Sequence, residues 1–309
     1  DLTCLDNPLT INQRQIEVVA DNIVATYGEE KTLTYQIANG SLAFEDILSG
    51  NLEREQGKNV GTYNILIGTL QVQNPNYKID FVNGTYQIDK RPISIVASGS
   101  KMYGENDTTI EYQIADGELV KNDSLTGKLT RVGGETAGQY TILIGTLNND
   151  NYDITLNESF YEITKRPIVV TAFNQLKTYG QPDSVLTYQI DGLLGQDIVQ
   201  VQLKREQGED AGTYNIVLDG FSNANYFVQT FNPAIYTIEC ANVPFVAVDF
   251  EKTYDSNSYV VDMSDFEQFN YSIIYTNSNG LDVQAPVDAD TYVATISFAD
   301  NKNYFDKTF

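Results

Sequence analysis

The chain has 309 residues, carries a formal net charge of −23 and contains no histidine. Without an imidazole it can build neither a Ser-His-Asp or Cys-His nucleophilic site nor a histidine metal site, and it lacks the usual general base near neutral pH. It has only two cysteines and no CxxC pair, which excludes the common zinc sites. It also has no glycine-rich phosphate loop, which excludes the common nucleotide sites. The composition therefore predicts a protein that is not an enzyme and has no catalytic residues.

Charge and hydropathy restrict the partners of the chain. Phosphate binding depends on clustered Lys and Arg, so the strongly acidic balance argues against nucleic acid and anionic membrane surfaces as partners. No run of about 18 apolar residues occurs, so direct membrane insertion is not expected. Residues 1–13 form an N-terminal segment without an initiator Met or the regions of a signal peptide, and we interpret it as the start of a mature or excised fragment.

The strongest pattern in the sequence is an internal repeat. A Tyr-Gly pair, or Tyr-Asp in the last copy, recurs with spacings of 76, 76 and 75 residues at Tyr27, Tyr103, Tyr179 and Tyr254. A turn followed by a second tyrosine keeps the same period at Tyr63, Tyr140, Tyr214 and Tyr292. We predict repeats at 14–90, 91–165 and 166–240, and a divergent, truncated fourth repeat at 241–309 that stops before its final strand.

Within each repeat, apolar and polar residues alternate with a period of two. Examples are residues 93–97, 140–144 and 161–163. This alternation is typical of half-buried strands, and Gly-Thr, Asn-Gly and Asn-Asp-Asn turns separate them. A single helical turn is conceivable only over stretches such as 41–47 and 192–198. The pattern predicts an all-β fold with about six or seven short strands in each repeat.

The Asp-Ala-Gly-Thr-Tyr segment that ends at Tyr214 resembles the tyrosine corner of immunoglobulin-like sandwiches. We therefore predict a tandem array of small Ig-like β-sandwich units. A β-grasp-like unit with one short helix is the alternative, because about 76 residues is small for an Ig domain. At the boundary around Pro92 the last strand of one repeat passes into the next with almost no linker, so we expect an elongated rod on the order of 150 Å long.

The 21 tyrosines could form a carbohydrate-stacking surface or serve folding. Of these, 18 occupy repeat-equivalent places, and a residue kept in every copy is explained more simply by packing within the unit than by one ligand site. We favour the structural role.

The acidic loops could in principle hold an ion or a catalytic pair. A loop such as residues 148–153 offers oxygen ligands for Ca²⁺ between repeats, although it lacks the spacing of a known calcium loop, and a solvated turn is the simpler interpretation. Carboxylate pairs of a carbohydrate-active enzyme are a remote alternative, since nothing marks a cleft. No cofactor is therefore expected, with Ca²⁺ left open.

Cys4 precedes the first repeat and Cys240 ends the third. In a straight rod their Cα atoms could not approach within the roughly 7 Å that a disulfide requires. Both are then free, or each pairs outside this run of repeats, for example in an intermolecular disulfide.

The repeated segments resemble a known family. Lys-Thr-Tyr-Gly, Leu-Thr-Tyr-Gln-Ile, Leu-Ser-Gly-x-Leu-x-Arg, Gly-Glu-x-Ala-Gly-x-Tyr and Ile-Thr-Lys-Arg-Pro-Ile together look like the MBG domain of the YGX type, a repeat of large bacterial surface adhesins. The resemblance covers residues 14–240 well and the remainder loosely. The fourth repeat departs from it at Tyr254-Asp255, and it has no clear Leu-Ser-Gly-x-Leu segment.

The resemblance implies a secreted protein at the bacterial cell surface whose repeats project a binding region, with no catalytic residues. We expect a stalk segment of an adhesin whose partners are other domains of the same long chain, with surface glycans or like chains as further candidates. The alternative is a subunit of a self-assembling extracellular filament.

Overall fold

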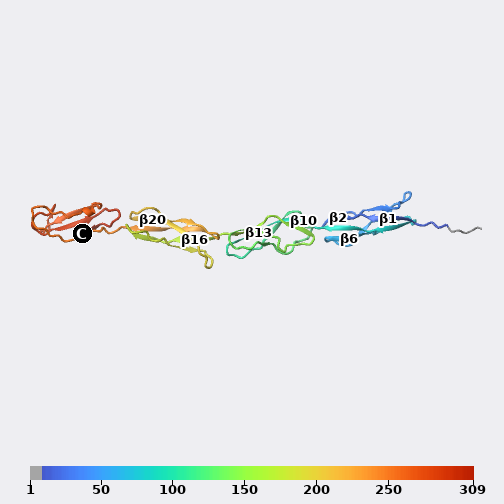
Figure 1. The fold of residues 1–309 in the computed structure, drawn as a ribbon, viewed down its shortest axis with the longest axis horizontal. Coiled ribbons are helices and arrows are strands. Elements are labelled where there is room, and N and C mark those ends of the chain that lie inside the picture. Colours follow the sequence, from blue (N-terminus) through green and yellow to red (C-terminus); the bar gives the residue numbers. More distant parts are fainter. Residues whose placement is uncertain (1–8) are drawn as a thin grey trace, which may run out of the picture. The chain divides into compact units, whose positions relative to one another are not determined.

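The computed structural model describes residues 9–309 and divides into two compact units, Asp1–Thr164 and Lys165–Phe309 (Figure 1). The described residues contain strands β1 to β26, one short 3-10 helix and no α-helix. The all-β prediction is therefore confirmed, and the β-grasp alternative, which requires a helix, finds no support in residues 9–309. No helix in this range is long and apolar enough to cross a membrane.

The first repeat, in the first unit, folds into two main sheets. Its strands are β1 (Arg14–Ala20), β2 (Ile23–Thr26), β3 (Tyr35–Asn39), β4 (Leu48–Ser49), β5 (Glu53–Arg54), β6 (Gly61–Leu66), β7 (Gln71–Val72), β8 (Tyr77–Val82) and β9 (Gly84–Asp89). One sheet has the order β3-β1-β8 and the other β2-β9-β6-β5, while β4 and β7 form a small ribbon. The chain changes sheets between β1 and β2, so β1 belongs to the first sheet and β2 to the second.

Alternating side chains from the two sheets meet in one core. Ile16 and Val18 of β1 are buried, as are Ile65 of β6 and Tyr86 and Ile88 of β9. The alternation follows from the pleat, which points successive side chains to opposite faces. Burying each of these side chains contributes about 1.5–3 kcal/mol. The first repeat is therefore a small sandwich, as predicted.

The second repeat keeps this plan with one long first strand. Its strands are β10 (Arg91–Met102), β11 (Glu111–Asp116), β12 (Thr130–Arg131), β13 (Gly138–Leu143), β14 (Tyr152–Leu156) and β15 (Phe160–Thr164). The start of β10 pairs with β11 and β14, and its end pairs in parallel with β15. Only Lys90 separates β9 from β10, which confirms the prediction of almost no linker at this boundary.

The second unit begins with a third repeat of the same topology. Its strands are β16 (Arg166–Ala172), β17 (Gln175–Thr178), β18 (Tyr188–Asp191), β19 (Val201–Arg205), β20 (Gly212–Phe221), β21 (Tyr226–Asn232) and β22 (Ala234–Glu239). They form sheets of order β18-β16-β21 and β17-β22-β20-β19, matching the two main sheets of the first repeat.

The fourth repeat keeps only one sheet. It contains the 3-10 helix η1 (Ser264–Phe266) and strands β23 (Tyr271–Thr276), β24 (Asp282–Val283), β25 (Val293–Phe298) and β26 (Lys307–Thr308), in the order β24-β23-β25-β26. A parallel bridge between Ala241 and Tyr304 stands where β16 and β21 begin to pair in the third repeat. Up to Phe309, the described residues hold no counterpart of the three-stranded sheet.

Candidate functional site: the arginine clusters and the joints within each unit

Every repeat has a tyrosine corner. In each copy the tyrosine hydroxyl donates a hydrogen bond to the backbone carbonyl four residues earlier. The donor and acceptor pairs are Tyr63 and Asn59, Tyr140 and Thr136, Tyr214 and Asp210, and Tyr292 and Asp288, at 2.6 to 3.1 Å. The corner predicted from the sequence is thus present in all four repeats, including the divergent one.

In the first three repeats an arginine lies between the corner tyrosine and a tyrosine of the last strand. The Arg131 guanidinium is 5.1 Å from the Tyr140 ring centroid and 5.2 Å from that of Tyr161. Arg54 and Arg205 are placed in the same way against their own pairs of rings. A cation over an aromatic face is attracted by the ring quadrupole, and more strongly when water is excluded.

The turn beside this arginine also requires glycine. Arg131 donates 2.6 Å and 3.1 Å hydrogen bonds to the carbonyls of Gly134 and Val132. Gly134 has a φ of 151°, and a Cβ on it would lie 2.2 Å from the ring of Tyr140. The guanidinium therefore links the turn, the corner and the last strand.

The second and third repeats extend this arrangement into an ion cluster. Lys101 donates 2.7 Å to Asp107 and also bonds to Glu135, while Arg131 binds both carboxylates. The lysine side chain is only 2% exposed, whereas the carboxylates remain 45% and 68% exposed. The third repeat repeats the cluster with Lys177, Asp183, Arg205 and Glu209.

The cluster shifts the pKa of its members toward the charged state. Hydrogen bonds from Arg131 and then Lys101 lower the pKa of Asp107 from 3.8 to about 2. Hydrogen bonds from Arg205 and then Lys177 lower the pKa of Asp183 to the same value. Burial by itself would lower the pKa of Lys101, but its bonds to the two carboxylates raise it above the ordinary value. All members therefore stay charged at neutral pH, which suits an ion pair and is unsuited to proton transfer.

The first repeat lacks the cluster. Ala25 stands at the place of Lys101, and Lys58 at the place of Glu135. Arg54 keeps its bond to the Gly57 carbonyl, yet among residues 9–309 it forms no ion pair. The buried lysine and its carboxylate thus occur together or are replaced together, as expected when an unpaired buried charge is costly.

We predict that the second and third repeats lose stability in acid through this cluster. The folded pKa of Asp107 lies below its unfolded value, so the stabilisation is present above about pH 4 and is lost as the pH falls through about 2. Because Asp107 is partly exposed, the loss should be about 1 kcal/mol. Amide hydrogen exchange in the second repeat at the two pH values measures it. In Asp107→Asn this pH dependence should become smaller, because only Glu135 of the cluster then titrates in acid, and an unchanged dependence would contradict the assignment.

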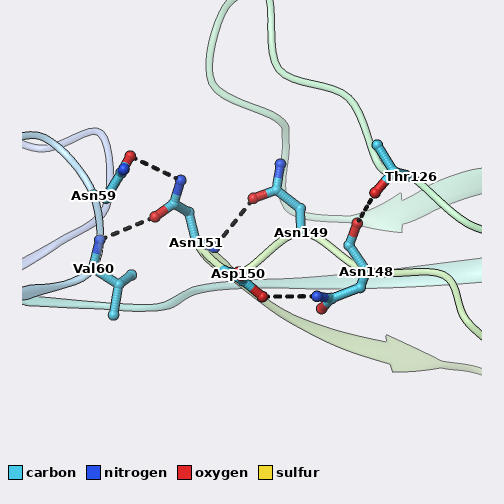
Figure 2. A pocket seen from close by; sticks show the side chains of 7 residues that line it. All are labelled: Asn59, Val60, Thr126, Asn148, Asn149, Asp150 and Asn151. Atoms are coloured by element: carbon cyan, nitrogen blue, oxygen red, sulfur yellow. Dashed lines mark hydrogen bonds between the residues drawn. The ribbon is translucent and has the colours of Figure 1, made fainter.

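The joint between the first and second repeats is made by an asparagine and two tyrosines. Asn151 accepts a 3.0 Å bond from the Val60 amide and donates to the side chain of Asn59 at 3.2 Å, as Figure 2 shows. The rings of Tyr27 and Tyr152 meet edge to face at 5.5 Å. These contacts join the corner turn and the Tyr-Gly turn of one repeat to the Asn-Tyr segment of the next.

At the same joint Arg91 forms a hydrogen bond between the two repeats, and Gly28 leaves room for a side chain of the second repeat. Arg91 donates to the Tyr27 carbonyl and to Glu118 of its own repeat. Gly28 has a φ of 86°, and a Cβ there would lie 2.5 Å from Val120. A glycine after the tyrosine is therefore required both by the turn and by the neighbouring repeat.

The second unit contains the same joint between its third and fourth repeats. Asn303 accepts a 2.7 Å bond from the Ala211 amide and donates to Asp210, and the Tyr179 and Tyr304 rings meet edge to face at 5.4 Å. Lys302 adds an ion pair with Asp210. Two joints in two separate units thus share the bond from a backbone amide to an asparagine and the edge-to-face pair of tyrosine rings.

Asn151 should be the residue on which the first joint depends. We expect Asn151→Ala to cost about 1 kcal/mol, because it removes two cross-repeat hydrogen bonds. Hydrogen exchange at the Val60 amide should rise about five-fold, in line with that free energy. Asn148→Ala is the matched control, since the Asn148 side chain bonds to Asp150 of its own loop. Equal exchange at Val60 in both variants would show that the asparagine does not hold the joint.

The loop considered for Ca²⁺ lines a polar hollow of about 550 Å³ at this first joint (Figure 2). Its amides and carboxylate are engaged with each other: Asn148 bonds to Asp150, and Asn149 accepts from the Asn151 amide. Within residues 9–309 no group of three or more Asp, Glu or Cys side chains could hold a metal ion. The expectation of no cofactor, with Ca²⁺ left open, stays a prediction.

The proposed disulfide partners are placed only in part. Cys4 lies outside the described residues. Cys240 directly follows β22, is half-buried and is a free thiol. That each cysteine is free or pairs outside this run of repeats, for example in an intermolecular disulfide, stays a prediction.

The structural role assigned to the repeated tyrosines is supported by their hydroxyl bonds. Tyr86 accepts from the Lys31 amide, Tyr161 from Thr108 and Tyr236 from Ser184, each at a fully buried ring. The arginines between the rings, the buried lysines and the joint asparagines received no role from the sequence. The Leu-x-Arg and Asn-Tyr segments that recur with the repeat period were the signal that could have found them.

Comparison with known proteins agrees with this geometry. The model of the MBG domain (YGX type) matches residues 16–87, 94–161 and 168–237, which together make up more than half of the chain. A search of curated proteins gives no match. Each matched segment holds a Tyr-Gly turn, an arginine between two tyrosines and a tyrosine corner. The chain belongs to the MBG domain (YGX type) family.

Proposed function

We propose that this chain is a structural, non-enzymatic stalk segment of a secreted bacterial cell-surface adhesin, which carries a binding region away from the cell. Repeats of this family are typical of surface-associated proteins. The observation that carries the proposal is the joint, which recurs with the same asparagine and tyrosine contacts in two separate units. A spacer needs joints that fix the direction of each repeat, and side-chain contacts across a short boundary do this.

The chemistry of the repeats supports a mechanical role over a catalytic one. Asp107 and Asp183, whose pKa values are lowered to about 2, are held by Lys and Arg at repeated positions. An acid or base catalyst needs a pKa near the working pH, and these ion pairs move it away. We assign them to holding the second and third repeats together.

Two measurements test the proposal: the maximum dimension of the protein in solution and its location on the cell. Small-angle scattering of the 309-residue protein should give a maximum dimension on the order of 150 Å, with a shorter mean dimension in the double joint variant Asn151→Ala/Asn303→Ala. Antibody labelling of intact producing cells should place the repeats outside the envelope. A compact particle, or labelling only after lysis, would overturn the stalk proposal.

A further inference from the structure

In each of the first three repeats the chain that enters the repeat runs beside the chain that leaves it, in the same direction. In the second repeat the start of β10 is parallel to β14 and its end is parallel to β15. The first repeat pairs β1 with β8 and β2 with β9 in parallel. The third pairs β16 with β21 and β17 with β22 in the same way. We call the two members of each pair the entering and the leaving segment.

The register between the two segments is kept although the chain changes sheets. In the first repeat the difference in residue number between partners is the same at Arg14 and Tyr77 as at Thr26 and Asp89. In the second and third repeats this difference changes by a single residue along the pair. The entering and leaving segments therefore form one parallel ladder from end to end of the repeat, shared between its two sheets.

This pairing decides how a pull on the chain acts on a repeat. In the second repeat the chain enters at Arg91, opposite Tyr152, and leaves at Thr164, opposite Met102. Because the segments are parallel, the two points of attachment lie at opposite ends of the ladder. Tension along the chain therefore draws the segments past each other in shear. The hydrogen bonds between them are then loaded together, whereas a pull from one end would break them one after another.

The boundary between the first and second repeats transmits tension with little slack. The leaving segment of the first repeat ends with β9, the entering segment of the second begins with β10, and Lys90 alone separates them. A long flexible linker would extend before the folded parts were loaded. A boundary of one residue has almost no such extension, so the pull reaches the ladder directly.

Buried side chains oppose sliding of the two segments. Ile95 of the entering segment and Tyr161 of the leaving segment are fully buried in the same core. Lys101 lies opposite Ile163 in the ladder and forms ion pairs with Asp107 and Glu135. A shift of register would move the apolar side chains out of their packed sites and separate the buried lysine from its carboxylates.

We propose that each of the first three repeats is a mechanical clamp that bears tensile load through its entering and leaving segments. The second and third clamps are the stronger ones, because Lys101 and Lys177 hold ion pairs on the entering segment where the first repeat has Ala25. The biological use of the clamp rests on the proposed stalk function, and it adds that the stalk works under tension. The clamp itself is a property of a single molecule.

The first test pulls the second repeat of the full chain in two directions by single-molecule force spectroscopy. Handles at Lys90→Cys and Lys165→Cys load the ladder in shear, because they lie just outside its two ends. Handles at Lys90→Cys and Asp153→Cys peel β10 from β14 from one end, since Asp153 lies opposite Pro92. The side chains of all three handle positions are exposed.

The native cysteines are removed for this measurement by Cys4→Ser and Cys240→Ser. Both pairs of handles flank parts of the second repeat alone, so the other repeats are not loaded. Forced unfolding reports the rate of unfolding under load and not the equilibrium stability, which is the same molecule's in both geometries. We expect an unfolding force several times higher in shear than in peeling. Equal forces in the two geometries would overturn the proposal.

The second test compares two lysines of the second repeat. Lys101→Ala should lower the unfolding force in shear and leave the peeling force unchanged, because peeling begins at Arg91, at the other end of β10. Lys128→Ala removes an exposed lysine outside the entering and leaving segments and should change neither force. A force that Lys101→Ala leaves unchanged, or lowers equally in both geometries, would contradict the assignment of Lys101 to the clamp.

These measurements fail separately from those that test the stalk. A high shear force in a chain that is compact, or that lies inside the cell, would refute the stalk and support the clamp. Equal forces in shear and peeling, in a chain that is long and lies at the cell surface, would refute the clamp and leave the stalk intact.

Discussion

Arg131→Ala is expected to lower the free energy of unfolding of the second repeat by about 3 kcal/mol or more. The side chain is 7% exposed, lies between the rings of Tyr140 and Tyr161, and donates to two turn carbonyls. Its loss leaves a cavity between the rings and removes the partners of those carbonyls. Because a chain of four repeats need not unfold in one step, amide hydrogen exchange along β13 is the suitable measurement.

The matched control is Lys101→Ala, which reproduces the Ala25 found at this place in the first repeat. Its carboxylate partners are largely exposed and keep Arg131, so water and the arginine can compensate. We expect a clearly smaller loss than for Arg131→Ala. Equal losses in the two variants would mean that the ion pairs, and not the position of arginine between two rings, stabilise the repeat.

Tyr161→Ala should be comparably damaging, with a loss of about 3–5 kcal/mol in the second repeat. The ring is fully buried in the centre of the core, and its hydroxyl accepts the Thr108 amide. Tyr161→Phe removes only the hydroxyl and should cost about 1–2 kcal/mol. Hydrogen exchange at β13 and β15 reports both.

Phe160→Ala is the neighbouring control for this tyrosine. Its side chain is 40% exposed on the outer face of β15, so its removal should cost far less than that of Tyr161. If Tyr161→Ala left the stability unchanged but altered binding to a glycan surface, the tyrosines would be ligand residues, contrary to our interpretation.

The differences between repeats follow the same physical rules. A buried lysine is present where its carboxylate partners are present, and alanine replaces it where they are not. In the fourth repeat Tyr275 takes the place of the arginine, is 4% exposed and accepts the Val261 amide. Here Asp255 replaces the glycine of the Tyr-Gly turn, and the positive φ falls on Ser256 instead. The position that arginine occupies in the first three repeats is thus filled by a buried tyrosine in the fourth.

The sequence by itself determined the period, the strand class and the tyrosine corner. These depend on neighbours close in the chain: alternation with a period of two marks a strand face, and the corner hydroxyl reaches a carbonyl only four residues away. Such short-range patterns survive in every copy, even in the divergent fourth repeat.

Only the tertiary structure decided which charged residues meet and which side chains join neighbouring repeats. The partners Lys101 and Glu135 are 34 residues apart, and the joint bond between Val60 and Asn151 spans 91. Contacts over such separations depend on the register of strands across two sheets, which a single sequence does not display.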